Sequence, residues 1–181
     1  VRRAVELARR TAEGGGNCWM LGDLIHNRFV VEDLARRGIR KTADSALLGP
    51  DDIVIIRSHG ELKSVLDALE QRGVRCVNAT CPNVIRIQRL VAQAEAEGRQ
   101  PVIIGEAAHP EVAGIASWCL SPLVFDGPES VQAWLDTPES KREIPMTVVA
   151  QTTCIRELFE TSWEIIKKEC TNVKIFDTIC D

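Results

Sequence analysis

The sequence lacks tyrosine, has only three histidines, and contains no apolar run of the roughly 20 residues that a membrane-spanning helix needs. It also lacks a segment with the pattern of a secretory signal peptide. The formal net charge is −4 and the pI is about 5.5, without the basic excess typical of nucleic-acid binding. We therefore expect a protein with neither a membrane nor a nucleic acid among its partners.

The seven cysteines include no Cys-x-x-Cys pair, which argues against a zinc ribbon and against a thioredoxin-type redox motif. The alternation of strands and helices described below is typical of intracellular proteins, where structural disulfides are rare. We expect reduced thiols in a cytoplasmic protein, some of them available as metal ligands. The cysteines are Cys18, Cys76, Cys81, Cys119, Cys154, Cys170 and Cys180.

Short apolar runs alternate with amphipathic segments along the whole chain. Two of the runs, at 53–56 and 102–104, are continuous and suit strands that are buried on both faces. The alternation predicts an α/β fold of repeated βαβ units with small parallel sheets and helices on both faces. Strands are expected at 18–21, 39–41, 52–57, 74–77, 101–105, 123–125, 147–150 and 173–176.

The pattern divides near residue 82 into two similar halves. We expect a first α/β domain at 1–81, a second at 82–176, and the start of a truncated third domain at 177–181. The chain opens on a helix with two arginines and no N-cap residue, although cations are disfavoured at that end. No helix follows the last strand, so we expect a fragment of a longer protein.

All three histidines, His26, His59 and His109, follow a predicted strand and precede a predicted helix. Cys81, Thr152-Thr153 and Cys180 also lie at strand ends. Ligands of open parallel sheets bind outside these carboxyl ends, so we expect a site there, between the domains. Free N–H groups at helix N-termini, together with imidazoles, suit a phosphate or diphosphate. The alternative for any single histidine is a capping or hydrogen-bonding role.

Two of these positions allow both a structural and a chemical interpretation. Cys81 lies where a strand ends and a helix begins at Pro82, where the helix dipole favours a thiolate ligand or nucleophile. The alternative for Cys81 is a small residue that fills a tight corner. Glu111 follows His109 in a first helical turn, as a helix-stabilising carboxylate or as a proton donor. Thr152 either caps the next helix or faces the ligand.

Taken together, six motifs resemble the LytB (IspH) family of 4-hydroxy-3-methylbut-2-enyl diphosphate reductases. Each motif is weak alone, but the set runs in family order over nearly the whole chain. The motifs are Ile25–Val31 (IHNRFVV), Arg57–Gly60 (RSHG), Asn78–Pro82 (NATCP), His109–Val112 (HPEV), Gln151–Thr153 (QTT) and Ile179–Cys180 (IC).

The resemblance implies a 4Fe-4S cluster held by three cysteines, with Cys81 and Cys180 as two ligands and the third missing from this chain. The open iron would act as Lewis acid and electron conduit. The implied reaction is reductive dehydroxylation of the allylic diphosphate to isopentenyl and dimethylallyl diphosphate, in the methylerythritol phosphate pathway of isoprenoid biosynthesis. Ferredoxin or flavodoxin would supply the electrons.

The resemblance also assigns the polar residues. It gives substrate binding to His26, His59, His109 and Thr152, with the first two histidines near the diphosphate, and proton donation to Glu111.

The chain departs from the family pattern in several places. The family's first cluster cysteine and its third domain are absent, and Ala150 stands where the family often has threonine. The five other cysteines match no ligand position, and we expect them to be packing residues. We expect an active parent protein and an inactive fragment.

Three alternatives stay open at this point. The first is a non-catalytic or degenerate chain with no cluster. The second is a metal-free enzyme that binds a phosphate ester through the three histidines and Glu111. The third is a zinc site built from Cys81, Cys180 and a histidine.

Overall fold

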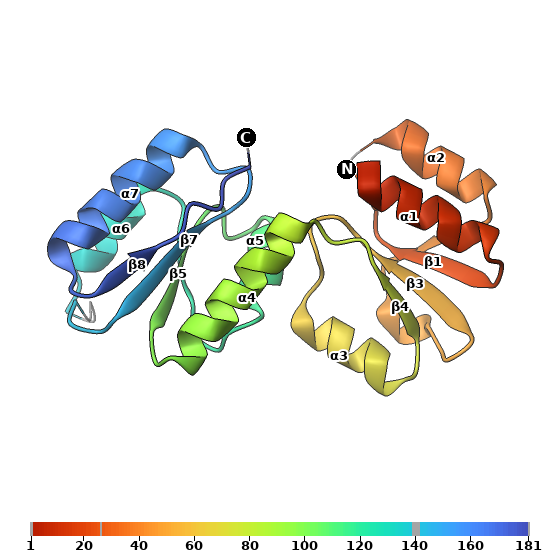
Figure 1. The fold of residues 1–181 in the computed structure, drawn as a ribbon, viewed down its shortest axis with the longest axis horizontal. Helices are drawn as coiled ribbons and strands as arrows, with labels where there is room; N and C mark the ends of the chain where they lie inside the picture. Colours follow the sequence, from red (N-terminus) through yellow and green to blue (C-terminus); the bar gives the residue numbers. More distant parts are fainter. Residues whose placement is uncertain (1, 26, 139–141, 181) are drawn as a thin grey trace. The chain divides into compact units, whose positions relative to one another are not determined.

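A computed structural model describes residues 2–25, 27–138 and 142–180 of the 181-residue chain. The chain forms two compact units, Val1–Pro82 and Asn83–Asp181, and each unit contains one four-stranded sheet (Figure 1). Every strand pairing in both sheets is parallel. The predicted α/β fold of repeated βαβ units with small parallel sheets is confirmed.

The sheet of the first unit has the strand order β2-β1-β3-β4, with α1 and α2 on one face and α3 on the other (Figure 1). The 3-10 turn η1 was not expected from the sequence. The elements are α1 (Arg2–Glu13), β1 (Asn17–Leu21), α2 (Arg28–Arg36), β2 (Arg40–Thr42), η1 (Ser45–Leu47), β3 (Asp52–Ile56), α3 (Lys63–Gln71) and β4 (Arg75–Asn78).

The apolar run of β3 is buried because helices cover both faces of this sheet. Ile55 packs in the core beneath α1 and α2, together with Met20 of β1 and Leu34 of α2. Val54 and Ile56 point to the opposite face and pack with Leu69 of α3. A continuous apolar run is what a parallel strand with two covered faces requires.

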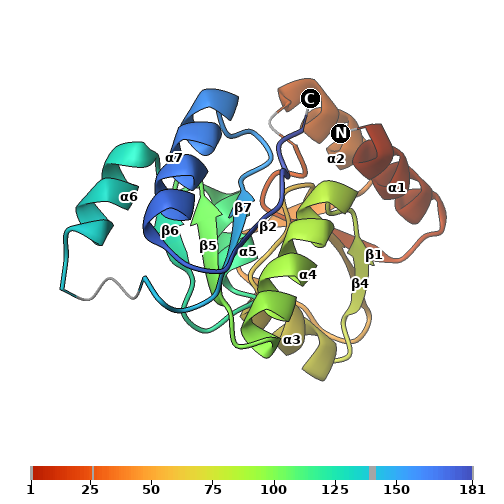
Figure 2. The ribbon, with the colours of Figure 1, turned by 60° about the vertical axis from the view of Figure 1, so that its left-hand side comes forward.

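The sheet of the second unit has the order β6-β5-β7-β8, which repeats the order of the first unit. Figures 1 and 2 show α6 and α7 on one face of this sheet and α4 and α5 on the other. The elements are α4 (Pro82–Ala96), β5 (Gln100–Ile104), α5 (Pro110–Ala116), β6 (Leu123–Phe125), α6 (Pro128–Leu135), β7 (Met146–Ala150), α7 (Arg156–Glu169) and β8 (Val173–Ile175).

One hydrophobic core of the second unit lies between its sheet and the helices α6 and α7. Val148 of β7 packs there with Val131 of α6 and with Phe159 and Ile166 of α7, all at most 2% exposed. β7 is buried at all five positions because it lies inside the sheet, between β5 and β8. The turn that carries Thr152 therefore begins at the end of a fully buried strand.

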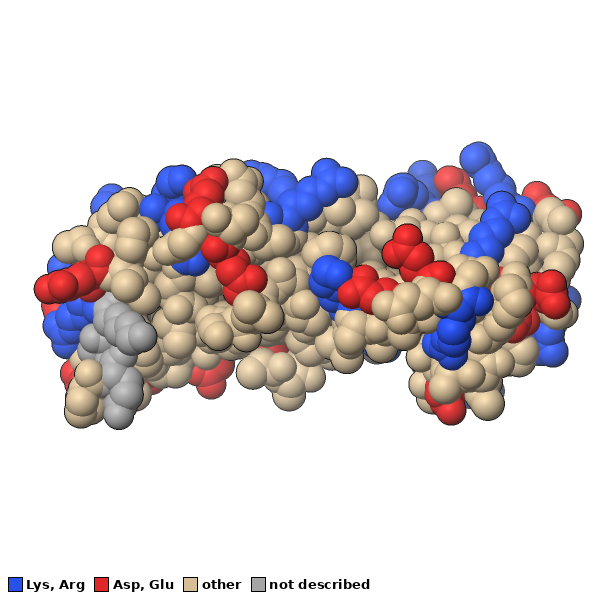
Figure 3. All heavy atoms as spheres, turned by 90° about the horizontal axis from the view of Figure 1, so that it is seen from below, with Lys and Arg blue, Asp and Glu red and all other residues tan. Residues whose placement is uncertain are grey.

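Charges of both signs are interspersed on the face shown in Figure 3. Ion pairs tie neighbouring elements together, such as Arg9 of α1 with Asp33 of α2 at 2.8 Å and Arg156 of α7 with Asp177 at 2.7 Å. All seven cysteines are free thiols. None of the helices in the described part of the chain is long and apolar enough to cross a membrane.

Candidate functional site

The predicted site residues fall into the two units. His59 and Cys81 lie in the first unit, whereas His109, Glu111, Thr152 and Cys180 lie in the second. His26, which was predicted to bind substrate, lies outside the described residues. Within the second unit, hydrogen bonds connect the four predicted residues to one another, and we describe these first.

His109 is the N-cap residue of α5, and Pro110 takes the first helical position. The backbone of His109 is extended, at φ −72° and ψ 133°, as expected for a residue that precedes proline. Its Nδ1 accepts a hydrogen bond from the N–H of Glu111 at 3.1 Å. A neutral imidazole that accepts at Nδ1 carries its proton on Nε2. His109 therefore presents Nε2–H as a hydrogen-bond donor.

Glu111 is a buried carboxylate that is bonded to Thr152. Its side chain is held at 5% exposure, and Thr152 is 6% exposed. The N–H of Thr152 donates to Oε1 at 2.7 Å, and the Thr152 hydroxyl lies 2.8 Å from both carboxylate oxygens. The carboxylate of Glu111 is thus bonded to Thr152, the second residue after β7, and not to the N–H groups of its own helix. A carboxyl group and a hydroxyl in this contact can hold a proton and pass it between them.

Thr152 does not cap the helix that follows it. The N-cap residue of α7 is Ile155, which makes no side-chain capping bond. The hydroxyl of Thr152 is committed instead to Glu111.

Gly105, directly after β5, allows the turn after β7 to approach the N-terminus of α5. A Cβ atom at Gly105 would lie 2.7 Å from Cβ of Gln151 and 2.9 Å from its Oε1. That oxygen accepts the N–H of Glu106 at 3.1 Å, while the amide nitrogen donates to Thr153 at 3.0 Å. A side chain at 105 would push away the turn that carries Thr152.

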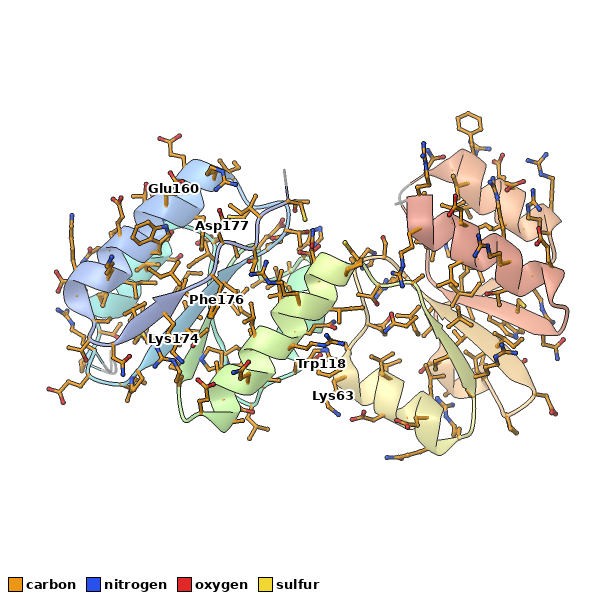
Figure 4. The ribbon with its side chains drawn as sticks, viewed as in Figure 1. Lys63, Trp118, Glu160, Lys174, Phe176 and Asp177 are labelled. Carbon is orange, nitrogen blue, oxygen red and sulfur yellow. The ribbon has the colours of Figure 1, made fainter. Side chains whose placement is uncertain are left out.

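Cys180 is fastened to the same turn through its backbone. Its N–H donates to the carbonyl oxygen of Thr152 at 2.8 Å. The buried hydroxyl of Thr178 donates to the carbonyl of Ala150 at 2.7 Å and accepts the N–H of Ala150 at 2.8 Å. The side chain of Asp177, which is labelled in Figure 4, accepts a hydrogen bond from the N–H of Ile179 at 3.2 Å. Glu111, Thr152 and Cys180 therefore form one connected group.

Cys81 is held in the first unit by the same kind of bonds. Its N–H donates at 2.7 Å to the carbonyl of Ser58, the second residue after β3, as Thr152 is the second residue after β7. The side chain of Asn78, three residues before Cys81, accepts the N–H of Thr80 at 3.0 Å. Asp177, three residues before Cys180, likewise accepts the N–H of the residue two places after it, Ile179. Both thiols are at least partly exposed, which does not fit the alternative of a corner-filling residue for Cys81.

His59 lies in the turn after β3, beside the residue that holds Cys81. The N–H and the hydroxyl of Ser58 both lie near the carbonyl of Leu24, at 3.3 and 3.2 Å. Arg57 pairs with the buried carboxylate of Glu61 at 3.0 Å across the turn. These bonds fix the backbone on both sides of His59.

The other five cysteines all have a pKa above that of an ordinary thiol. Burial raises the pKa of each of these thiols, and for Cys119 burial and the nearby Glu95 raise the pKa to about 11. A protonated thiol is a poor nucleophile and a poor metal ligand. The buried Cys18 and Cys170 fit the packing roles expected from the sequence, whereas Cys119 and Cys154 are half-buried and Cys76 is exposed.

Sequence reasoning missed the residues that position the cysteines. An acidic or amide residue three places before both Cys81 and Cys180 is visible in the sequence and is a signal for a turn. The contact of Asn83 with Cys180 has no such signal, because 97 residues separate the two. In the described part of the chain, no group of three or more His, Cys, Asp or Glu side chains is arranged to hold a metal ion.

The family model described as LytB protein matches residues 1–181. Two curated relatives named 4-hydroxy-3-methylbut-2-enyl diphosphate reductase align over 185 residues. The relative from Geobacter sulfurreducens is 37% identical and that from Thermoanaerobacter sp. (strain X514) is 34% identical. Each alignment covers 100% of this chain and 62% of the relative, so the chain spans less than two thirds of their length.

Two solved structures share the fold. A structure described as (E)-4-hydroxy-3-methyl-but-2-enyl diphosphate reductase matches with a TM-score of 0.86 and 32% identity, over 99% of this chain and 63% of that chain. A reductase structure from Plasmodium falciparum matches with a TM-score of 0.89 over 99% of this chain and 57% of that chain. At 20% identity, the second match shows the fold alone.

Proposed function

Because the chain belongs to the LytB family, we propose that the protein to which it belongs reduces 4-hydroxy-3-methylbut-2-enyl diphosphate to isopentenyl and dimethylallyl diphosphate. This is a reductive dehydroxylation in the methylerythritol phosphate pathway of isoprenoid biosynthesis, and we propose that it takes place in the cytoplasm. The observation that supports it best is the buried Glu111–Thr152 pair, bonded through the backbone of Thr152 to Cys180.

We propose that Cys81 and Cys180 each bind an iron of a 4Fe-4S cluster, with a third cysteine outside this chain. Their chemistry fits, because thiolates are the usual ligands of iron–sulfur clusters. Their placement also fits, since both are at least partly exposed and are held by equivalent backbone bonds. When bound, the cluster supplies electrons and a Lewis-acidic iron, and ferredoxin or flavodoxin is the proposed electron donor.

We propose that the three histidines bind the diphosphate end and neighbouring oxygens of the substrate. His109 presents Nε2–H, since its Nδ1 is occupied by the N–H of Glu111. A hydrogen-bond donor at a helix N-terminus suits a phosphate oxygen. His26 and His59 are assigned to the diphosphate by the resemblance of their motifs.

Glu111 is the proposed proton donor, acting with the hydroxyl of Thr152. Replacing a C–O bond by a C–H bond, with the oxygen leaving as water, consumes two electrons and two protons. The contact of 2.8 Å allows the Thr152 hydroxyl to bridge between the carboxyl group of Glu111 and a substrate hydroxyl. Burial of both residues keeps competing water away from the proton.

The test is anaerobic reconstitution of the full-length protein with iron and sulfide, followed by visible absorbance and product formation. We expect a coloured, oxygen-sensitive protein that forms both products. Residues 1–181 are treated in parallel and are expected to give no turnover, because they hold two of the three proposed cluster ligands. A colourless full-length protein without turnover would favour a non-catalytic chain.

A further inference from the structure

The side-chain amide of Asn83 contacts the sulfur of Cys180. The distance from Nδ2 of Asn83 to Sγ of Cys180 is 2.8 Å. Asn83 is the second residue of α4 and its side chain is exposed, so it fills no core position. We propose that Asn83 is a positioning residue that orients the Cys180 sulfur and raises the reduction potential of the cluster bound there. This inference rests on the proposed function.

The direction of the hydrogen bond follows from the chemistry of the two groups. A sulfur that ligates iron is a thiolate and can only accept hydrogen bonds, whereas the carboxamide offers N–H donors on one side. The amide must therefore turn Nδ2 toward the sulfur. The N-terminal end of α4 adds positive potential near the same point.

Two polar side chains beside Asn83 are engaged with other partners. Asn83, Arg86, Asp177, Thr178 and Ile179 line a cavity of about 50 Å³ next to Cys180. The carboxylate of Asp177 is paired with Arg156 at 2.7 Å, and the hydroxyl of Thr178 is used by Ala150. Asn83, by contrast, directs its N–H at the sulfur.

The bond acts on the position and on the electronics of the sulfur. The backbone of Cys180 is fixed by its N–H bond to Thr152, and Asn83 fixes the side chain at a second point. Hydrogen bonds to cysteine sulfurs are among the factors that set the potential of iron–sulfur clusters. An N–H donor stabilises the more negative, reduced cluster more strongly than the oxidised one, so it raises the potential.

The experiment uses the cluster-loaded full-length protein and three substitutions on α4. Asn83→Leu removes the N–H at similar size, and Asn83→Asp also adds a negative charge beside the sulfur. Gln93→Leu is the matched control, because Gln93 is exposed on the same helix and its amide is bonded to Glu97. The midpoint potential is measured by redox titration followed by electron paramagnetic resonance, with resonance Raman of the Fe–S(Cys) stretches.

We expect Asn83→Leu to lower the midpoint potential, with the ratio of reduced to oxidised cluster falling roughly threefold to tenfold at a fixed poise. A tenfold change corresponds to about 59 mV for a one-electron couple. Asn83→Asp should lower the potential further, and Gln93→Leu should leave it unchanged. The Fe–S(Cys) stretch should shift in the two Asn83 variants and stay in place in the control.

The outcomes separate this inference from the proposed function. If Cys180→Ser loses the cluster but Asn83→Leu keeps the wild-type potential and Raman spectrum, the inference fails and the proposed function stands. If the wild-type protein binds no cluster, both fail. If Asn83→Leu binds no cluster, Asn83→Asp decides: a wild-type potential in that variant overturns the inference.

Discussion

The two units share one strand order and yet carry different chemistry at their strand ends. In each unit a cysteine follows the fourth strand, and its N–H is bonded to the second residue after the third strand, Ser58 or Thr152. In each, the side chain three residues before the cysteine closes a small turn. The same local bonds therefore place Cys81 and Cys180, and this equivalence follows from the fold.

The helix after the first strand of each unit shows where the units differ. The second residue of α2 is Phe29, which is 80% exposed, whereas the second residue of α5 is Glu111, which is 5% exposed. Asn27 caps α2 by accepting the N–H of Val30, and His109 caps α5 by accepting the N–H of Glu111. The shared fold presents cysteines in both units, but only the second has an acid at this position.

The largest expected effect comes from removing that acid. Glu111→Gln keeps the shape of the side chain, but a carboxamide cannot donate a proton as a carboxylic acid does. We expect turnover by the cluster-loaded full-length protein to fall by about 10²- to 10⁴-fold, the usual contribution of a general acid. Glu157→Gln, an exposed change in the first turn of α7, is the matched control and should keep wild-type turnover.

A smaller effect is expected from the anchor of the second cysteine. Thr178→Val leaves the N–H and the carbonyl of Ala150 without their buried partner, which costs about 1–3 kcal/mol of unfolding free energy. Urea denaturation measures this cost. Thr171→Val, at an exposed threonine, should change the unfolding free energy by less than about 0.5 kcal/mol. Equal costs for the two variants would show that the Thr178 anchor does not matter.

The smallest effect concerns the surface of the first unit. Hydrogen bonds from Arg9, and then from Arg37, hold the pKa of Asp33 below its usual value. A depressed folded pKa gives stability above the unfolded pKa of about 3.9, and this stability is lost as the pH falls through the folded pKa. We expect Asp33→Asn to lower the urea midpoint slightly near neutral pH, to begin converging with wild type below about pH 4, and to match it below the folded pKa of Asp33. A constant difference down to pH 2 would contradict this.

Particular residues show what the sequence could and could not predict. The apolar runs at 53–56 and 102–104 predicted the buried strands β3 and β5, because a parallel strand covered on both faces needs such a run. The positions of Cys81 and Cys180 after strands followed from the predicted strands, whereas their role as cluster ligands comes from the family resemblance and stays a prediction. Neither the bond from Thr152 to Glu111 nor that from Asn83 to Cys180 could be predicted, since 41 and 97 residues separate the partners. Such contacts depend on how strands and helices pack, which periodicity does not specify.

The central claim is that the two equivalent cysteines both ligate one cluster. The most direct measurement is the iron content and visible absorbance of the anaerobically reconstituted full-length protein, with Cys81→Ser and Cys180→Ser compared. Cys76→Ser, at an exposed cysteine with a raised pKa, is the control. We predict that both ligand variants lose the intact cluster and turnover while the control keeps them. A Cys81→Ser or Cys180→Ser protein with a full cluster and wild-type turnover would contradict the account.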